Sequence, residues 1–130
     1  MIQHAKASNL VRKLKNAYDE CLDTFDVIVM PTTPMHASLI PDTSSKDNLT
    51  EQITRSFEMV ANTSPFNATG HPAMSIPCGM VPVVSSTASH EGDRSALPVG
   101  VMIVSKHFNE ERIYQVARVF ETLFNEQKRN

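Results

Sequence analysis

The sequence lacks the features that membrane-spanning and nucleic-acid-binding proteins need. Its longest apolar runs, residues 27–30 and 99–104, are far shorter than the roughly 20 residues of a membrane-spanning helix. The 130 residues carry 12 Lys and Arg against 14 Asp and Glu, a formal net charge of −2. No excess of positive charge is therefore available to bind phosphate backbones. We expect neither a membrane nor a nucleic acid as a partner.

Cysteine is also scarce. The two cysteines, Cys21 and Cys78, are far apart and stand in different contexts. The first 20 residues mix charged and apolar side chains at helical spacing, instead of forming the continuous apolar segment of a secretory signal. Because disulfides belong to oxidising compartments, we expect two free thiols and a cytoplasmic location.

Metal-ligand motifs and glycine-rich motifs are absent from the sequence. Zinc sites typically contain two histidines spaced i,i+4 or a Cys-x-x-Cys motif. The five histidines form no such pair, and neither cysteine belongs to such a motif. The four glycines are isolated, and no Gly-x-Ser-x-Gly sequence occurs. These patterns predict no metal site and no cofactor.

The apolar residues that are present predict alternating helices and strands. Apolar side chains recur at helical spacing over residues 8–25, which predicts an amphipathic helix. Residues 27–30 are uniformly apolar and mostly β-branched, so they predict a strand whose two faces both need cover. This chain alone is expected to have difficulty covering both. A proline-rich loop follows, and then a second helix that begins at Asn48 or Thr50 and ends before Pro65.

The second half of the chain predicts a hairpin and a final helix. Residues 73–76 and 99–104 are strand candidates, joined by a long loop over residues 81–96 that is rich in serine. The last helix begins at Asn109, where two acidic residues follow at its positive end. This order of helices and strands is typical of an α/β layered architecture.

Three blocks of sequence carry a resemblance that covers nearly the whole chain. They are residues 25–34 (FDVIVMPTTP), 62–79 (NTSPFNATGHPAMSIPCG) and 97–104 (LPVGVMIV). In order and spacing they resemble the amidase-signature family of hydrolases, where such blocks lie at the C-terminal end of a chain several times longer. The resemblance implies an α/β fold in which residues 1–130 are a single partial domain, the C-terminal portion of a mixed sheet flanked by helices.

The resemblance also implies a reaction, which is acyl transfer from an amide to water. In the family a Ser nucleophile, activated through a second Ser and a Lys, lies upstream of this region in a loop rich in Gly and Ser. Small residues there let backbone donors approach the developing oxyanion. This chain has no such loop, so we assign it no catalytic residue and expect it to be inactive alone. Its expected partner is the remainder of the amidase chain, and the substrate of the intact enzyme is a small amide.

Polar side chains gather between the second helix and the strand at residues 73–76. In the family the corresponding turn approaches the substrate cavity, so Thr63 and Asn67 are candidate lining residues and Phe66 is a candidate apolar wall. The alternative is that Asn67 and Thr69 satisfy backbone groups of an irregular turn. Side-chain direction cannot be derived from sequence, so both interpretations stay open.

Two further alternatives belong to different classes of protein. A stand-alone structural or oligomerising module could dock a partner, or a second copy, through exposed strand edges. A small independent hydrolase could instead pair His71 with Cys78. An extended strand after His71 would carry Cys78 away from it, which favours a structural role for this histidine in a Gly-His-Pro turn.

Overall fold

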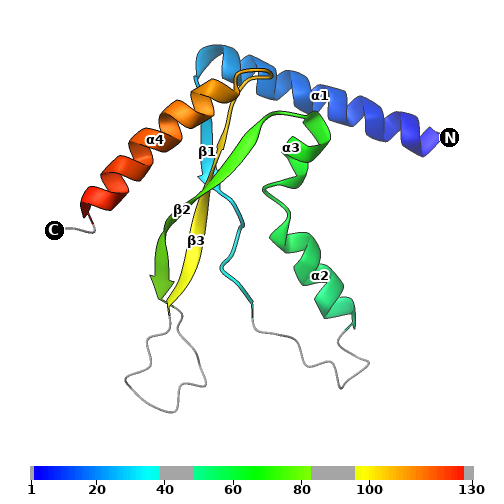
Figure 1. Cartoon of the computed structure of the whole chain (residues 1–130). Coiled ribbons are helices and arrows are strands. Elements are labelled where there is room, and N and C mark those ends of the chain that lie inside the picture. The colour runs from blue at the N-terminus through cyan, green and yellow to red at the C-terminus, as the bar shows by residue number, and fades with distance from the viewer. Residues whose placement is uncertain (1, 39–48, 83–95, 128–130) are drawn as a thin grey trace.

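The computed structural model describes residues 2–38, 49–82 and 96–127. Within these ranges, four helices and three strands follow one another (Figure 1). They are α1 (Ile2–Thr24), β1 (Ile28–Pro31), α2 (Leu49–Met59), α3 (Ser64–Thr69), β2 (Ala73–Pro82), β3 (Ala96–Val104) and α4 (Glu110–Gln127). The α/β fold class is therefore confirmed.

The three strands form an antiparallel sheet in the order β1-β3-β2. The expected hairpin is present, because β2 pairs with β3 from Ala73 opposite Val104 to Pro82 opposite Ala96. A register shift between Pro77 and Gly79 interrupts this pairing, as a β-bulge does. Most of the predicted connecting loop, residues 83–95, lies outside the described residues.

The core forms where β3 meets the helices at one end of the sheet. In Figure 1, α1 crosses this end while α3 and α4 lie on different sides of the hairpin. Met102, Ile103 and Val104 of β3 are 3%, 1% and 0% exposed. Phe66 of α3 packs with Met102 and Val104, and the ring of Tyr18 on α1 lies 4.9 Å from the Phe66 ring, centroid to centroid. The best-packed part of the molecule therefore adjoins the junction between α3 and β2.

Some helices and strands differ in extent from the sequence prediction. The first helix begins at Ile2, not at residue 8, and the predicted strand at residues 73–76 continues to Pro82. Residues 64–69 were expected to belong to a turn, but they form the short helix α3. The second helix ends at Met59, before Pro65 as predicted.

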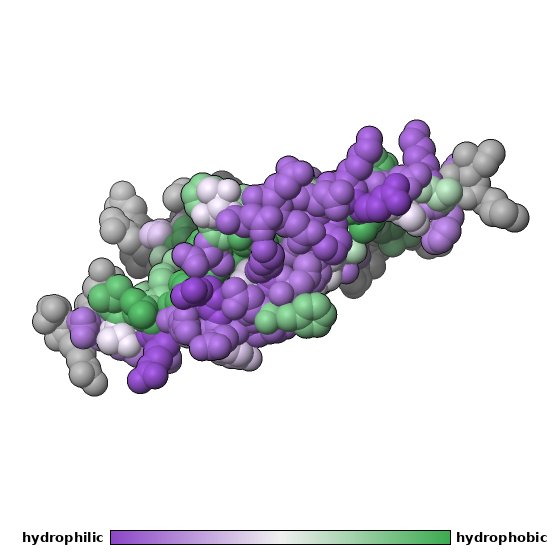
Figure 2. Space-filling view, turned by 90° about the horizontal axis from the view of Figure 1, so that it is seen from above, coloured by the Kyte–Doolittle hydropathy of each residue, from purple (hydrophilic) through white to green (hydrophobic). Residues whose placement is uncertain are grey.

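Many apolar side chains are exposed on the described part of the chain. As expected for this chain alone, the two faces of β1 are not both covered by the described residues, because Val29 is 56% exposed. The apolar face predicted for α2 is uncovered as well, with Ile53 48% and Phe57 71% exposed. Figure 2 shows one face of the molecule, on which hydrophobic residues (green) lie among hydrophilic ones (purple). None of the helices in the described ranges combines the length and apolar character required to span a bilayer.

Replacing the buried methionine of β3 should test the position of the core. We expect Met102→Ala to lower the free energy of unfolding by about 2–5 kcal/mol, because it leaves a cavity beside Phe66 and Val104. Met80→Ala is the matched control on β2, since Met80 is 60% exposed, and it should change stability by less than about 0.5 kcal/mol. Urea unfolding followed by circular dichroism measures both. Equal losses for the two variants would contradict this packing.

Candidate functional site

A small hollow lies between α3 and the sheet. Its volume is about 280 Å³. Its lining residues come from the end of β1, from α3 and its flanks, and from β2 and β3: Thr32, Thr63, Phe66, Asn67, His71, Ala73, Ser75 and Met102. The three residues named from the sequence as substrate-binding candidates, Thr63, Phe66 and Asn67, are thus brought together. Their role in binding stays a prediction.

The short helix α3 presents these three residues to the hollow. Thr63 is its N-cap, and positions 63, 66 and 67 share one helical face because their spacing is i, i+3 and i+4. Gly70 ends the helix in the left-handed conformation, with φ at 77°, and its N–H donates to the Phe66 carbonyl at 2.8 Å. This is the usual glycine C-cap. The sequence alternative of an irregular turn is therefore wrong, because residues 64–69 are helical.

Two hydroxyl groups face each other at the sheet side of the hollow. Thr32 Oγ1 and Ser75 Oγ are 2.5 Å apart. They fit because residue 100 is glycine: a Cβ there would lie 2.9 Å from Ser75 Oγ and 3.0 Å from Thr32 Oγ1. The hollow therefore combines hydroxyl and amide groups with one aromatic wall.

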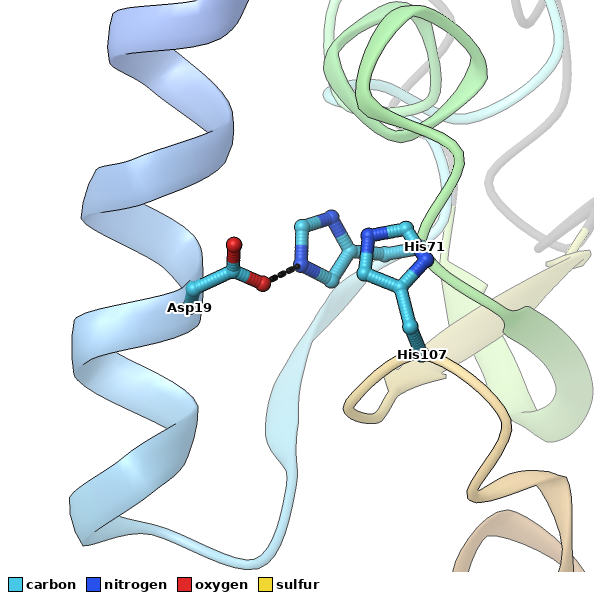
Figure 3. Close-up of side chains that lie close together, drawn as sticks. All are labelled: Asp19, His71 and His107. Carbon is cyan, nitrogen blue, oxygen red and sulfur yellow. Dashed lines mark hydrogen bonds and ion pairs between the residues drawn. The ribbon is translucent and has the colours of Figure 1, made fainter.

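A second group of polar side chains lies beside the hollow and centres on His71 (Figure 3). His71 Nε2 lies 3.2 Å from Asp19 Oδ1, and its Nδ1 lies 2.9 Å from Thr69 Oγ1. The His107 ring is next to the His71 ring, with centroids 4.2 Å apart. Lys15 Nζ donates to the other oxygen of Asp19 at 2.6 Å. The side chain of His71 is fully buried.

Burial and ion pairing shift the pKa values in this cluster. Desolvation lowers the pKa of His71 below its ordinary 6.5, and this effect exceeds the opposing effect of the hydrogen bond to Asp19. Lys15 lowers the pKa of Asp19, with a smaller contribution from His71, against a partly opposing effect of desolvation. The cluster therefore contains a carboxylate beside a neutral imidazole at pH 7.

The cluster does not form a nucleophilic site. A hydroxyl, an imidazole and a carboxylate joined by hydrogen bonds are the parts of a serine-hydrolase triad, but Thr69 is only 6% exposed, whereas a nucleophile has to meet its substrate. Cys78 is exposed and lines a different hollow, together with Val29 and Val99. His71 is bonded to Thr69 and Asp19 instead. This arrangement favours a structural role for His71 over a pair with Cys78.

The sequence did not single out Asp19 and His107. They are 52 residues before and 36 residues after His71, so no local spacing relates the three. Folding brings them together because α1, the turn before β2 and the segment after β3 meet at one end of the sheet.

The lowered pKa of His71 predicts how stability depends on pH. The unfolded chain binds the proton of this histidine more readily than the folded chain does. The contribution of His71 to stability is therefore fully present above pH 6.5, and it falls as pH decreases from 6.5 towards the folded-state pKa. NMR titration of the histidine ring resonances should give His71 a pKa below 6.5. A measured value at or above 6.5 would contradict the proposed effect of burial.

The close contacts of Gly100 predict an energetic coupling with Ser75. Gly100→Ala should destabilise the fold by about 1–3 kcal/mol, because the added methyl group collides with two hydroxyl groups. Adding Ser75→Ala removes one of those oxygens, so the double variant should be more stable than the sum of the single effects predicts, by at least about 0.5 kcal/mol. Chemical unfolding of the four proteins in this cycle measures the difference. Strict additivity would show that the two residues do not touch.

Comparison with known proteins gives the family context of these sites. The profile of the Amidase family matches residues 2–114. An enantioselective amidase of Rhodococcus rhodochrous is 38% identical over 114 residues, which are 87% of this chain and 19% of the relative. An uncharacterized protein encoded in the nthA 5' region of Rhodococcus erythropolis is 42% identical over 121 residues, 92% of this chain and 53% of that protein.

A solved structure shows the same relationship. One subunit of the glutamyl-tRNA(Gln) amidotransferase of Thermotoga maritima superposes with a TM-score of 0.53 at 28% sequence identity, covering 85% of this chain and 20% of that one. The chain thus spans about half of one relative and about a fifth of the others. Because the family profile covers most of the sequence and these relatives agree with it, the chain belongs to the amidase-signature family.

Proposed function

We propose that this chain supplies the C-terminal part of an amide-hydrolysing unit whose Ser-Ser-Lys triad lies outside residues 1–130. The observation that carries the proposal is the extent of the match. The chain aligns over 87% of its length with an enantioselective amidase, yet it corresponds to 19% of that enzyme. Its sequence has no loop rich in Gly and Ser that could place backbone donors around an oxyanion.

The exposed surfaces of the described residues support the remainder of an amidase chain as the partner. Strands β1 and β2 each pair on one side only within the described sheet, and an unpaired strand edge is a template for another strand. A groove of about 590 Å³ lies between β2 and α4, where Ile76, Phe120 and Phe124 are among the lining residues. Covering this apolar groove would remove its surface from water, which stabilises association.

The hollow beside α3 supports a role in substrate binding. Its volume of about 280 Å³ suits part of a small amide. The Asn67 carboxamide can donate to a carbonyl oxygen, and the Thr63 hydroxyl, which donates to the Val60 carbonyl, can still accept from an amide N–H. The buried ring of Phe66 gives the hollow an apolar wall. We propose that these three residues contact the amide substrate in the intact enzyme, and that the enzyme, with both thiols free, works in the cytoplasm.

The exposed apolar residues also suit the alternative function, a structural module that associates with itself. Val29, Phe57 and Tyr114 are 56%, 71% and 66% exposed, and two copies could cover such surfaces with each other. Light scattering coupled to size-exclusion chromatography separates the two proposals. A stable, concentration-independent oligomer favours self-association, whereas a monomer whose surface binds an apolar dye favours a missing partner.

The purified chain should be catalytically inactive. We expect no hydrolysis of small aliphatic or aromatic amides and no stoichiometric labelling by a fluorophosphonate probe, because we assign the activated serine to another part of the enzyme. The positive control is the Rhodococcus rhodochrous enantioselective amidase under the same conditions. Labelling of one serine per chain, detected by mass spectrometry, would overturn the assignment of the triad to another part of the enzyme.

A complementation experiment tests the positive side of the proposal. The Rhodococcus rhodochrous amidase can be truncated before the region that matches this chain and co-expressed with it. We expect the two pieces to copurify and to regain probe labelling on the amidase piece. Asn67→Ala in this chain should then impair amide hydrolysis more than labelling by a small probe, because Asn67 is assigned to the substrate and not to the nucleophile.

A further inference from the structure

Three potential metal ligands converge at the cluster around His71. Asp19 comes from α1, His71 from the turn before β2 and His107 from the segment between β3 and α4. Their ligand atoms all lie within 4.8 Å of one another. The side chains point towards one another from three separate segments (Figure 3).

We propose that Asp19, His71 and His107 bind a divalent transition-metal ion such as Zn²⁺. Imidazole and carboxylate are ligands that such ions accept, and three protein ligands leave a fourth position for water. Zinc bonds to nitrogen and oxygen of about 2.0–2.1 Å put two ligands of a tetrahedral ion about 3.3 Å apart. His71 Nε2 and Asp19 Oδ1 are already separated by 3.2 Å. The ligand atom of His107 lies within 4.8 Å of these two atoms, so it has to move closer for all three to bind one ion.

The atoms of His71 and Asp19 that would not bind the ion already have hydrogen-bond partners. A metal-bound histidine usually donates its second ring N–H to a nearby oxygen. Thr69 Oγ1, at 2.9 Å from His71 Nδ1, can accept such a bond once Nε2 binds the ion. For this bond, His71 carries its proton on Nδ1, and the hydroxyl hydrogen of Thr69 points away from the ring. Lys15 holds Asp19 by Oδ2, which leaves Oδ1 directed at the cluster.

His107 provides an independent observation. Within the described residues, its Nε2 is the buried side-chain nitrogen that has no hydrogen-bond partner. Leaving a buried polar atom without a partner is costly, and a metal bond would satisfy it. The His107 ring also lies against the His71 ring, with centroids 4.2 Å apart and the ring planes tilted by 39°.

The charges around the cluster permit a bound cation. Lys15 opposes it, but the Lys15 side chain is 40% exposed, so water screens its charge. Lys106, next to His107, is paired with Asp23. The carboxylate of Asp19 supplies negative charge directly at the site. A bound ion would join α1 to both strands of the hairpin, independently of amide hydrolysis.

Zinc titration of the tag-free chain tests the proposal. Isothermal titration calorimetry should detect one Zn²⁺ per chain. NMR should show the ring signals of His71 and His107 changing together as the ion is added. Asp19→Asn keeps the shape and a hydrogen-bond acceptor for His71 but removes the charge. His107→Gln removes the imidazole ligand at a position that is only partly buried. Each variant should lower the affinity at least about tenfold, the loss that even outer-shell changes can cause.

His36→Gln is the matched control, since His36 is exposed and belongs to no cluster among the described residues. It should leave affinity and stoichiometry unchanged. Circular dichroism of each apo variant establishes that it is folded, and Asp19→Asn still tests the site if His107→Gln does not fold. The proposal is overturned if the chain binds no zinc at micromolar concentrations. It is equally overturned if folded Asp19→Asn binds as tightly as the parent chain, or if His36→Gln weakens binding as much.

Discussion

Burial of the C-terminal half of β3 is the constraint on which the described structure depends. This strand has a neighbour on each side, β1 and β2, so its backbone groups bond in both directions while Ile103 and Val104 are almost entirely removed from water. Val104 stands opposite Ile28 on one side and Ala73 on the other. The chain therefore gathers at this level of the sheet, where α1, α3 and the start of α4 all arrive.

The same constraint explains why polar groups lie close together there. Ser105 follows directly after the buried run, is itself 0% exposed, and donates through Oγ to the Asn109 carbonyl. The segment from Ser105 to Asn109 is thus held against the core, and it carries His107 to His71. Buried polar groups need partners, and here Thr69, Asp19 and His71 supply most of them to one another.

Local sequence patterns predicted much of the fold but little of this cluster. Strand β3 could be predicted because residues 99–104 are a continuous apolar run rich in Val and Ile, and α4 because its apolar residues recur at helical spacing. Helix α3 was missed because Ser, Thr and Asn favour turns, although Pro65 near its start and Gly70 after its end are regular helix boundaries. The hollow was partly predictable, since Thr63, Phe66 and Asn67 are close in sequence. Asp19 and His107 reach His71 only through tertiary packing, which no local pattern encodes.

The exposed apolar side chains of α2 show the limit of prediction from sequence patterns. The periodicity of α2 calls for an apolar surface to pack against, yet Phe57 is 71% exposed. The helical periodicity of α2 is therefore formed, but its apolar face is not covered within the described residues.

His71 belongs to both places described above, since its ring lines the hollow beside α3 and also contacts Asp19 and Thr69. The His71 imidazole thus contacts both the hollow and the cluster. If a molecule in the hollow and a proton or ion on the cluster each shift that ring, they are thermodynamically linked, and each changes the affinity for the other by the same factor. The turn between α3 and β2 would then couple the hollow to the cluster through the displacement of a single side chain.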